Sequence, residues 1–203
     1  MLPSAPDSDA APSPLARFNQ APPTAAEAVL LACCGSHRWA RRVAAHRPYP
    51  TVEALLAAAD EAAYDLTSGD LAEALAGETP AALADRGGLS VHTALRAAHA
   101  HYESRFGHAF ILALDEATAA DPAAALDQTL AALRERLGHD ADEESAVTAE
   151  QLRRLCRSRL LRAFEPARSP DRAGSITPGL PRGTQAVSRR YDGRGRWTVP
   201  GRA

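Results

Sequence analysis

The chain has 203 residues, with 23 basic and 25 acidic side chains and a formal net charge of −2. This length suffices for one ordinary domain with a sizeable core, plus tails. No apolar run approaches the roughly 20 residues that span a bilayer, and Met1–Ser4 lacks the basic start of a signal peptide. We therefore expect a cytoplasmic protein without a membrane segment.

The first helix signals surround a corner of the chain. Thr24 and Glu27 have the spacing of a capping box and precede an apolar run, which predicts a helix start. Gly35 follows that run and tolerates the left-handed conformation that ends many helices. Ser36 can then cap a second helix, in which we expect Trp39 to be a core anchor. The pattern thus predicts two helices that meet at a sharp turn.

Further helix starts are indicated by residues that favour N-cap positions, namely Thr51, Ser90, Asp121 and Thr148. Asp121 is followed by Pro122, which suits the first helical position, and a leucine stripe comes next. Thr148 is followed three residues later by Gln151, which again resembles a capping box. Aromatic residues are only 5% of the chain, which favours close contacts between Ala-rich helices. The sequence predicts an all-α, single-domain bundle of seven or eight helices.

Charge separates the body of the chain from its C-terminal end. Residues 168–203 contain eight Arg and two Asp, many Pro and Gly, and no helical or alternating periodicity. Such a segment buries too little apolar surface to offset its ordering entropy. We therefore expect residues 1–15 and 166–203 to be disordered tails around a domain at 16–165. The arginines near Tyr191 and Trp197 also allow polyanion binding, an alternative to a solvated tail.

The three cysteines give no sign of a metal centre. Cys33 and Cys34 are adjacent, and only Cys156 remains, so their spacing fits no metal-ligand pattern. An odd number of cysteines in a protein without a secretion signal favours buried, reduced thiols.

Motifs in this order resemble those of one family: Cys34-Gly35-Ser36 with Arg38-Trp39, Arg47-Pro48-Tyr49, Asp70-Leu71, Tyr102-Glu103, Arg105-Phe106-Gly107 and Arg136-Leu137-Gly138. The family is that of the OHCU (2-oxo-4-hydroxy-4-carboxy-5-ureidoimidazoline) decarboxylases, and the resemblance covers roughly residues 16 to 165. It implies a helical homodimer that acts on a small anionic ureidoimidazoline. It also implies the last step from urate to (S)-allantoin, carried out without metal or organic cofactor.

The resemblance also implies a set of site residues. Glu78 stands where the family carries its catalytic His, while Asp85 and Arg86 stand near a substrate-binding Glu-Gln pair in a shortened loop. Arg159 matches an arginine near the substrate. The segment Phe110, Ile111, Leu112 and Ala113 matches one whose backbone amides hold the substrate.

The role of Glu78 is left open by the sequence. A carboxylic acid donates a proton near neutral pH only if burial or a neighbouring anion raises its pKa. The alternative is an exposed glutamate at a helix end. A histidine on the helix of His92 and His99, seven residues apart, is a further candidate acid or metal ligand. The sequence is therefore compatible with a working decarboxylase, a silent binding or regulatory member of the family, or a polyanion-binding protein.

Overall fold

A computed structural model describes residues 12–79, 89–165, 190–191 and 197–198. The chain divides into two compact units, residues 1–166 and 167–203. The described part of the first unit holds nine helices: α1 (Pro14–Gln20), α2 (Pro23–Leu31), α3 (His37–Ala45), α4 (Val52–Tyr64), α5 (Ser68–Ala76), α6 (Leu89–Phe106), α7 (Glu116–Ala120), α8 (Pro122–Arg136) and α9 (Ala141–Phe164). The all-α class is confirmed, and the nine include the short α1 and α7, which no apolar stripe in the sequence predicts.

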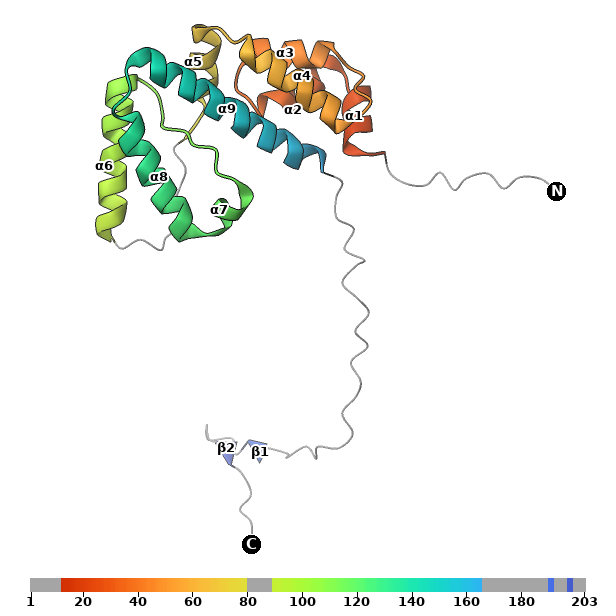
Figure 1. Cartoon of the computed structure of the whole chain (residues 1–203). Coiled ribbons are helices and arrows are strands. Elements are labelled where there is room, and N and C mark those ends of the chain that lie inside the picture. The colour runs from red at the N-terminus through yellow and green to blue at the C-terminus, as the bar shows by residue number, and fades with distance from the viewer. Residues whose placement is uncertain (1–11, 80–88, 166–189, 192–196, 199–203) are drawn as a thin grey trace, which may run out of the picture. The chain divides into compact units, whose positions relative to one another are not determined.

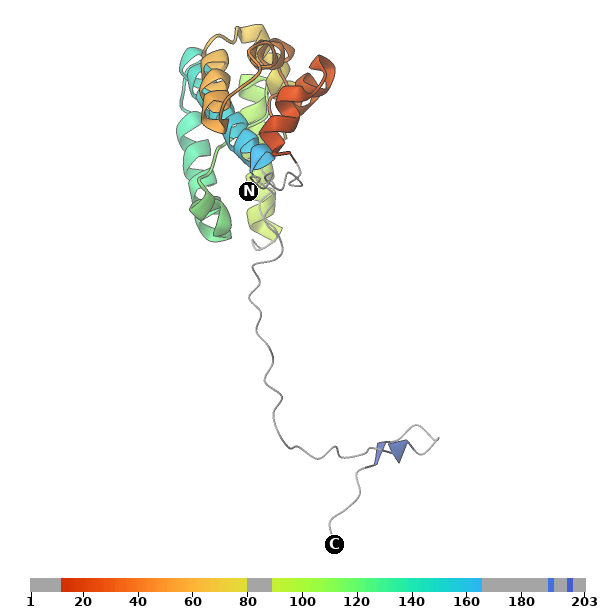
Figure 2. The ribbon, with the colours of Figure 1, turned by 90° about the vertical axis from the view of Figure 1, so that its right-hand side faces the viewer.

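The long helix α9 joins two groups of helices (Figure 1). In one group, α1 and α4 pack on α9, and α3 packs on α4. Helices α2 and α5 complete this group by packing on α3. Helices α6 and α8 lie side by side in the other group, as the view turned by 90° also shows (Figure 2). Within the described ranges, none of the helices combines the length and the apolar character that crossing a membrane requires.

Each group of helices has its own apolar core. The larger core draws on α1 to α5 and α9, and Trp39 at its centre is 1% exposed. The indole Nε1–H of Trp39 donates to the carbonyl of Ala59 at 2.9 Å, so the expected core anchor is confirmed. The smaller core contains Tyr102, Phe110 and the predicted leucine stripe of α8. Cys33, Cys34 and Cys156 are buried free thiols, as expected.

The corner between α2 and α3 is formed by Ser36 and Gly35, but Gly35 acts differently from the prediction. The Ser36 hydroxyl caps α3 by accepting from the backbone N–H of Trp39 at 3.3 Å. Gly35 does not adopt a positive φ, whereas Gly107, at the end of α6, does (79°). A Cβ on Gly35 would lie 3.2 Å from the carbonyl oxygen of Ala74. The missing side chain thus permits close approach of α5.

Three predicted helix starts are wrong: Ser90 lies inside α6, which begins at Leu89, and the other two are at Thr24 and Thr148. Helix α2 begins at Pro23, with Pro22 at the N-cap and no side-chain cap, so Thr24 lies inside the helix. Helix α9 begins at Ala141, where Asp140 and Glu143 form the capping box, and Thr148 is buried in its middle. In α2 and α9, another N-cap residue, Pro22 or Asp140, precedes the threonine, and the helix begins directly after it.

The described residues of the second unit form one pair of short antiparallel strands. Strand β1 (Arg190–Tyr191) pairs with β2 (Trp197–Thr198), with Tyr191 opposite Trp197. Residues 190–191 and 197–198 therefore differ from the expected disorder, as do Pro14 and Leu15 at the start of α1. The other residues of the predicted tails, apart from Pro12 and Ser13, lie outside the described residues.

Candidate functional site

A cavity of about 710 Å³ lies where three helices meet. Helix α5 forms one wall, the end of α6 with residues 107–109 forms another, and the first turns of α9 form a third. Polar and charged side chains on these walls are Ser68, Glu78, Glu103, Arg105, His108, Glu144 and Ser145, beside the apolar Leu71, Leu75 and Phe106. A cavity of this size accommodates a small organic molecule.

Glu78 lies on the cavity wall directly after α5, where its backbone N–H donates to the carbonyl of Leu75. Both of its carboxylate oxygens accept hydrogen bonds from the guanidinium of Arg159, at 2.6 and 2.7 Å. Arg159 also donates to the carbonyl of Cys33 at 3.1 Å. Two parallel N–H···O bonds are the strong, bidentate form of this pair.

The Glu78–Arg159 pair is largely shielded from water. The side chain of Glu78 is 9% exposed and that of Arg159 is 30% exposed. The hydrogen bonds to Glu78 raise the pKa of Arg159, although burial acts in the opposite sense. Both oxygens of Glu78 accept from this charged guanidinium, which is the geometry of a carboxylate–guanidinium ion pair.

In the segment of Phe110, Ile111, Leu112 and Ala113, the first two residues are buried and the last two are partly buried. Its backbone is already hydrogen-bonded: the Ile111 carbonyl accepts from Arg136 at 2.7 Å, and the Ala113 N–H donates to Gln151 Oε1 at 2.9 Å. Of the residues predicted for the site, the structure brings Glu78 and Arg159 together, and it does not place this segment on the cavity wall. Asp85 and Arg86 lie outside the described residues.

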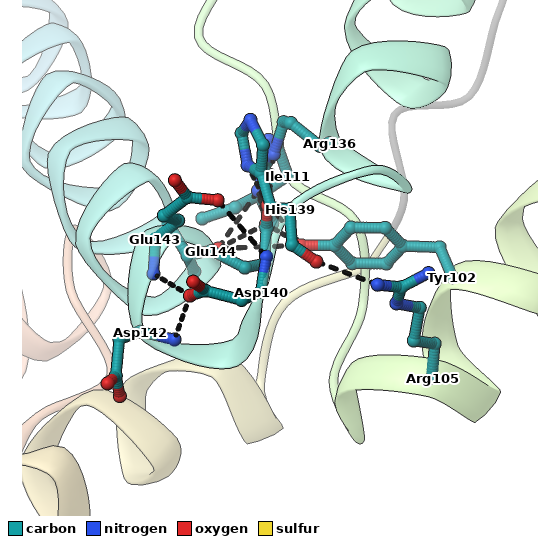
Figure 3. A network of polar contacts seen from close by, with 10 residues as sticks. Tyr102, Arg105, Ile111, Arg136, His139, Asp140, Asp142, Glu143 and Glu144 are labelled. Atoms are coloured by element: carbon teal, nitrogen blue, oxygen red, sulfur yellow. Dashed lines mark hydrogen bonds and ion pairs between the residues drawn. The ribbon is translucent and has the colours of Figure 1, made fainter.

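Glu144, which lines the cavity, belongs to a buried polar network (Figure 3). The guanidinium of Arg136 donates to Glu144 Oε1 at 2.9 and 2.6 Å, and it also reaches the Tyr102 hydroxyl at 2.9 Å and the Thr148 hydroxyl at 2.9 Å. The Tyr102 hydroxyl donates to Glu144, and His139 Nδ1 contacts the other Glu144 oxygen at 2.9 Å. All three of Tyr102, Arg136 and Glu144 are at most 3% exposed.

This network fixes the charge states of Glu144 and Tyr102. Burial opposes ionisation of Glu144, yet the hydrogen bonds from Arg136 and Tyr102 hold the pKa of this carboxyl below its usual value. Burial, with the hydrogen bond to Glu144, raises the pKa of Tyr102 to about 12. The ion pair is thus complete and Tyr102 stays neutral, so the network supports the cavity wall as a rigid element.

His108 lies on the same cavity wall, directly after the left-handed Gly107. Its Nδ1 is 3.1 Å from the carbonyl oxygen of Ala109, and its ring stands edge-on to Tyr102 with 5.6 Å between the centroids. Sequence reasoning did not select this histidine, because its place in a loop follows no periodic pattern. Only the fold brings it to the cavity of Glu78.

His99, which the sequence offered as a substitute acid, is in the smaller core instead. It is 9% exposed, stacks on Phe110 with 5.7 Å between the centroids, and has no hydrogen-bond partner for Nε2 among the described residues. Burial lowers the pKa of His99, while Glu103 acts against this shift. In the described part of the chain, no three His, Cys, Asp or Glu residues gather as metal ligands do.

The helices around this cavity match a known family. The family model of the OHCU decarboxylases matches residues 19–81 and 77–161, which is more than half of the chain. The chain belongs to the OHCU decarboxylase family. A search of curated proteins gave no match.

Two solved structures share the fold of this family member. A crystal structure of (S)-allantoin synthase matches with a TM-score of 0.58 and 20% identity, over 74% of this chain and 53% of that one. An OHCU decarboxylase crystallised in the presence of (S)-allantoin matches with a TM-score of 0.56 and 19% identity, over 66% of this chain and 95% of that one. The chain spans about half the length of the (S)-allantoin synthase.

Proposed function

We propose that this chain is a decarboxylase-like protein of urate degradation. It binds a small anionic ureidoimidazoline and releases carbon dioxide from it, without metal or organic cofactor, to give (S)-allantoin. Family membership supports this reaction class, and the structural neighbours include one crystallised in the presence of (S)-allantoin. By family resemblance we also propose that it acts as a homodimer in the cytoplasm.

One observation carries the proposal: Glu78, which lines a cavity of suitable size, is bound by the guanidinium of Arg159. Arg159 binds the carboxylate of Glu78, and the carboxylate of a substrate has the same shape and charge. We therefore propose that the substrate competes with Glu78 for Arg159. Since the pair is bidentate, this competition costs binding energy and lowers the affinity for the substrate.

The same pair makes Glu78 a poor proton donor. A carboxylate that accepts two hydrogen bonds from a guanidinium is stabilised in its ionised form and holds no proton to give. Glu78 also places a negative charge at the cavity wall, which opposes an anionic substrate. We propose that Glu78 modulates binding and that any turnover is slow.

A silent binding protein is the second candidate, and the occupied Arg159 favours it. The two candidates are separated by following freshly generated OHCU with and without the protein, with chiral detection of allantoin. A working enzyme accelerates decay and gives an excess of (S)-allantoin. Decay at the spontaneous rate to racemic allantoin, at every pH tested, would rule out turnover and leave the binding role.

A further inference from the structure

We propose that His108 is the general acid of this chain, a role that rests on the decarboxylation proposed above. Removal of carbon dioxide leaves an electron pair on a ring carbon, which then needs a proton. Glu78 is held as a carboxylate by Arg159, at 2.6 and 2.7 Å, and has no proton to supply. His108 is the one histidine on the described wall of the same cavity.

The surroundings of His108 define which ring nitrogen carries out the transfer. The carbonyl oxygen of Ala109 only accepts hydrogen bonds, so the contact of 3.1 Å places a proton on Nδ1. No group among the described residues bonds to Nε2, which leaves this nitrogen available to a ligand. His108 therefore exchanges its proton through Nε2.

The ring of His108 is also held in place. It stands edge-on to the ring of Tyr102, and the Tyr102 hydroxyl is fixed by Arg136 and Glu144 in the buried network (Figure 3). The left-handed Gly107 turns the chain between α6 and His108. A buried network of this kind keeps the donor at one position, which a proton transfer to carbon requires.

Four other charged or titratable groups line the cavity: Glu78, Glu103, Arg105 and Glu144. Glu78 and Glu144 each form an ion pair with an arginine, so the arginine neutralises the negative charge of the carboxylate. Of the groups on this wall, His108 is therefore the one left to supply the proton.

The proposed step balances as follows. The bond from the ring carbon to the carboxylate breaks, its electron pair stays on that carbon, and carbon dioxide leaves. The Nε2 proton of the imidazolium passes to the carbon. The neutral imidazole then regains a proton from water, so that each turnover consumes one proton.

The test uses the full chain and freshly generated OHCU with wild type, His108→Phe, His108→Ala and His101→Ala. His108→Phe keeps an aromatic edge against Tyr102, so it preserves the fold while it removes the proton. We expect it to lower the acceleration at least about 100-fold, the usual contribution of a general acid. His101 is exposed on α6 and off the cavity wall, so His101→Ala should keep the wild-type rate.

Chemical rescue separates a catalytic role from a structural one. Imidazole added to His108→Ala should restore part of the rate, and the restored rate should decline as pH rises and imidazolium is lost. An active wild type together with an equally active His108→Phe would overturn the role of His108 and leave the decarboxylation intact. A folded His108→Ala that imidazole does not rescue would also overturn it. An inactive wild type would instead overturn the decarboxylation itself, and the catalytic role of His108 with it.

Discussion

Arg136, at the end of α8, and Glu144, in the first turns of α9, form an ion pair inside the protein. Their side chains are 4% and 1% exposed, and two N–H groups of Arg136 bond to one oxygen of Glu144, at 2.6 and 2.9 Å. Because the pair also binds Tyr102, Thr148 and the Ile111 carbonyl, it joins α6, α8, α9 and the segment after α6.

Glu144→Gln should destabilise the protein by about 3–5 kcal/mol, because it leaves the guanidinium of Arg136 buried without a counter-charge. Urea unfolding followed by circular dichroism would measure this loss. The control is Glu135→Gln at an exposed position of α8, which should change the free energy of unfolding by less than about 0.5 kcal/mol. Equal effects of the two substitutions would show that the ion pair is not a structural element.

Trp39→Ala should cost about 3–5 kcal/mol, the range for truncating a large aromatic side chain in a core. The indole is 1% exposed and its N–H bonds to the Ala59 carbonyl, so the change removes both packing and a hydrogen bond between α3 and α4. Tyr64→Ala is the matched control, since Tyr64 is 73% exposed. Denaturant midpoints that barely move for Trp39→Ala would contradict its place in the core.

Gly35→Ala and Gly69→Ala should have opposite effects. A Cβ on Gly35 would lie 3.2 Å from the backbone oxygen of Ala74, which cannot move without shifting α5, so we expect a loss of about 1–3 kcal/mol. A Cβ on Gly69, inside α5, would approach nothing closer than the Thr67 hydroxyl at 3.8 Å. There, alanine should stabilise the helix by up to about 1 kcal/mol. Thermal melts of both variants would compare them directly.

Local signals in the sequence predicted the parts of the fold that depend on neighbouring residues. Ser36, Thr51 and Asp121 cap their helices as expected, because an N-cap needs only the backbone N–H groups two or three residues ahead. The start of α9 was missed since its first turns are polar and offer no apolar stripe. Glu144 in those turns is buried, and Arg136 from another helix supplies its counter-charge.

The site could be predicted from the sequence only in part. Glu78 and Arg159, 81 positions apart, were each selected through the family resemblance, but their direct pairing depends on how α5 and α9 pack. His108 was missed because the cavity that it lines is formed by segments far apart in the chain. Residue spacing along one helix or loop does not predict which distant segments contact each other in the fold.

Stability should fall as the pH drops below about 6.5, the ordinary pKa of histidine, in part because of His99. Burial lowers the pKa of His99 in the folded chain, so the unfolded chain binds its proton first and gains stability relative to the fold. The resulting loss in free energy of unfolding grows until the pH is below the pKa of His99 in the folded chain. His99→Gln should weaken this acid sensitivity, and His101→Gln, at an exposed site, should not. Unfolding midpoints at a series of pH values would measure both.

Glu78→Gln should preserve decarboxylation and improve substrate binding. The amide keeps the size of the side chain but loses the charge that holds Arg159 at 2.6 and 2.7 Å, so the guanidinium becomes available to the substrate carboxylate. We expect KM to fall several-fold while kcat stays within about threefold of wild type, because the proton comes from His108. Glu73→Gln is the matched control, since Glu73 lies on α5 but off the cavity wall. Steady-state kinetics on freshly generated OHCU decide the matter: a Glu78→Gln protein that falls to the spontaneous rate would make Glu78 the acid and remove the need for His108.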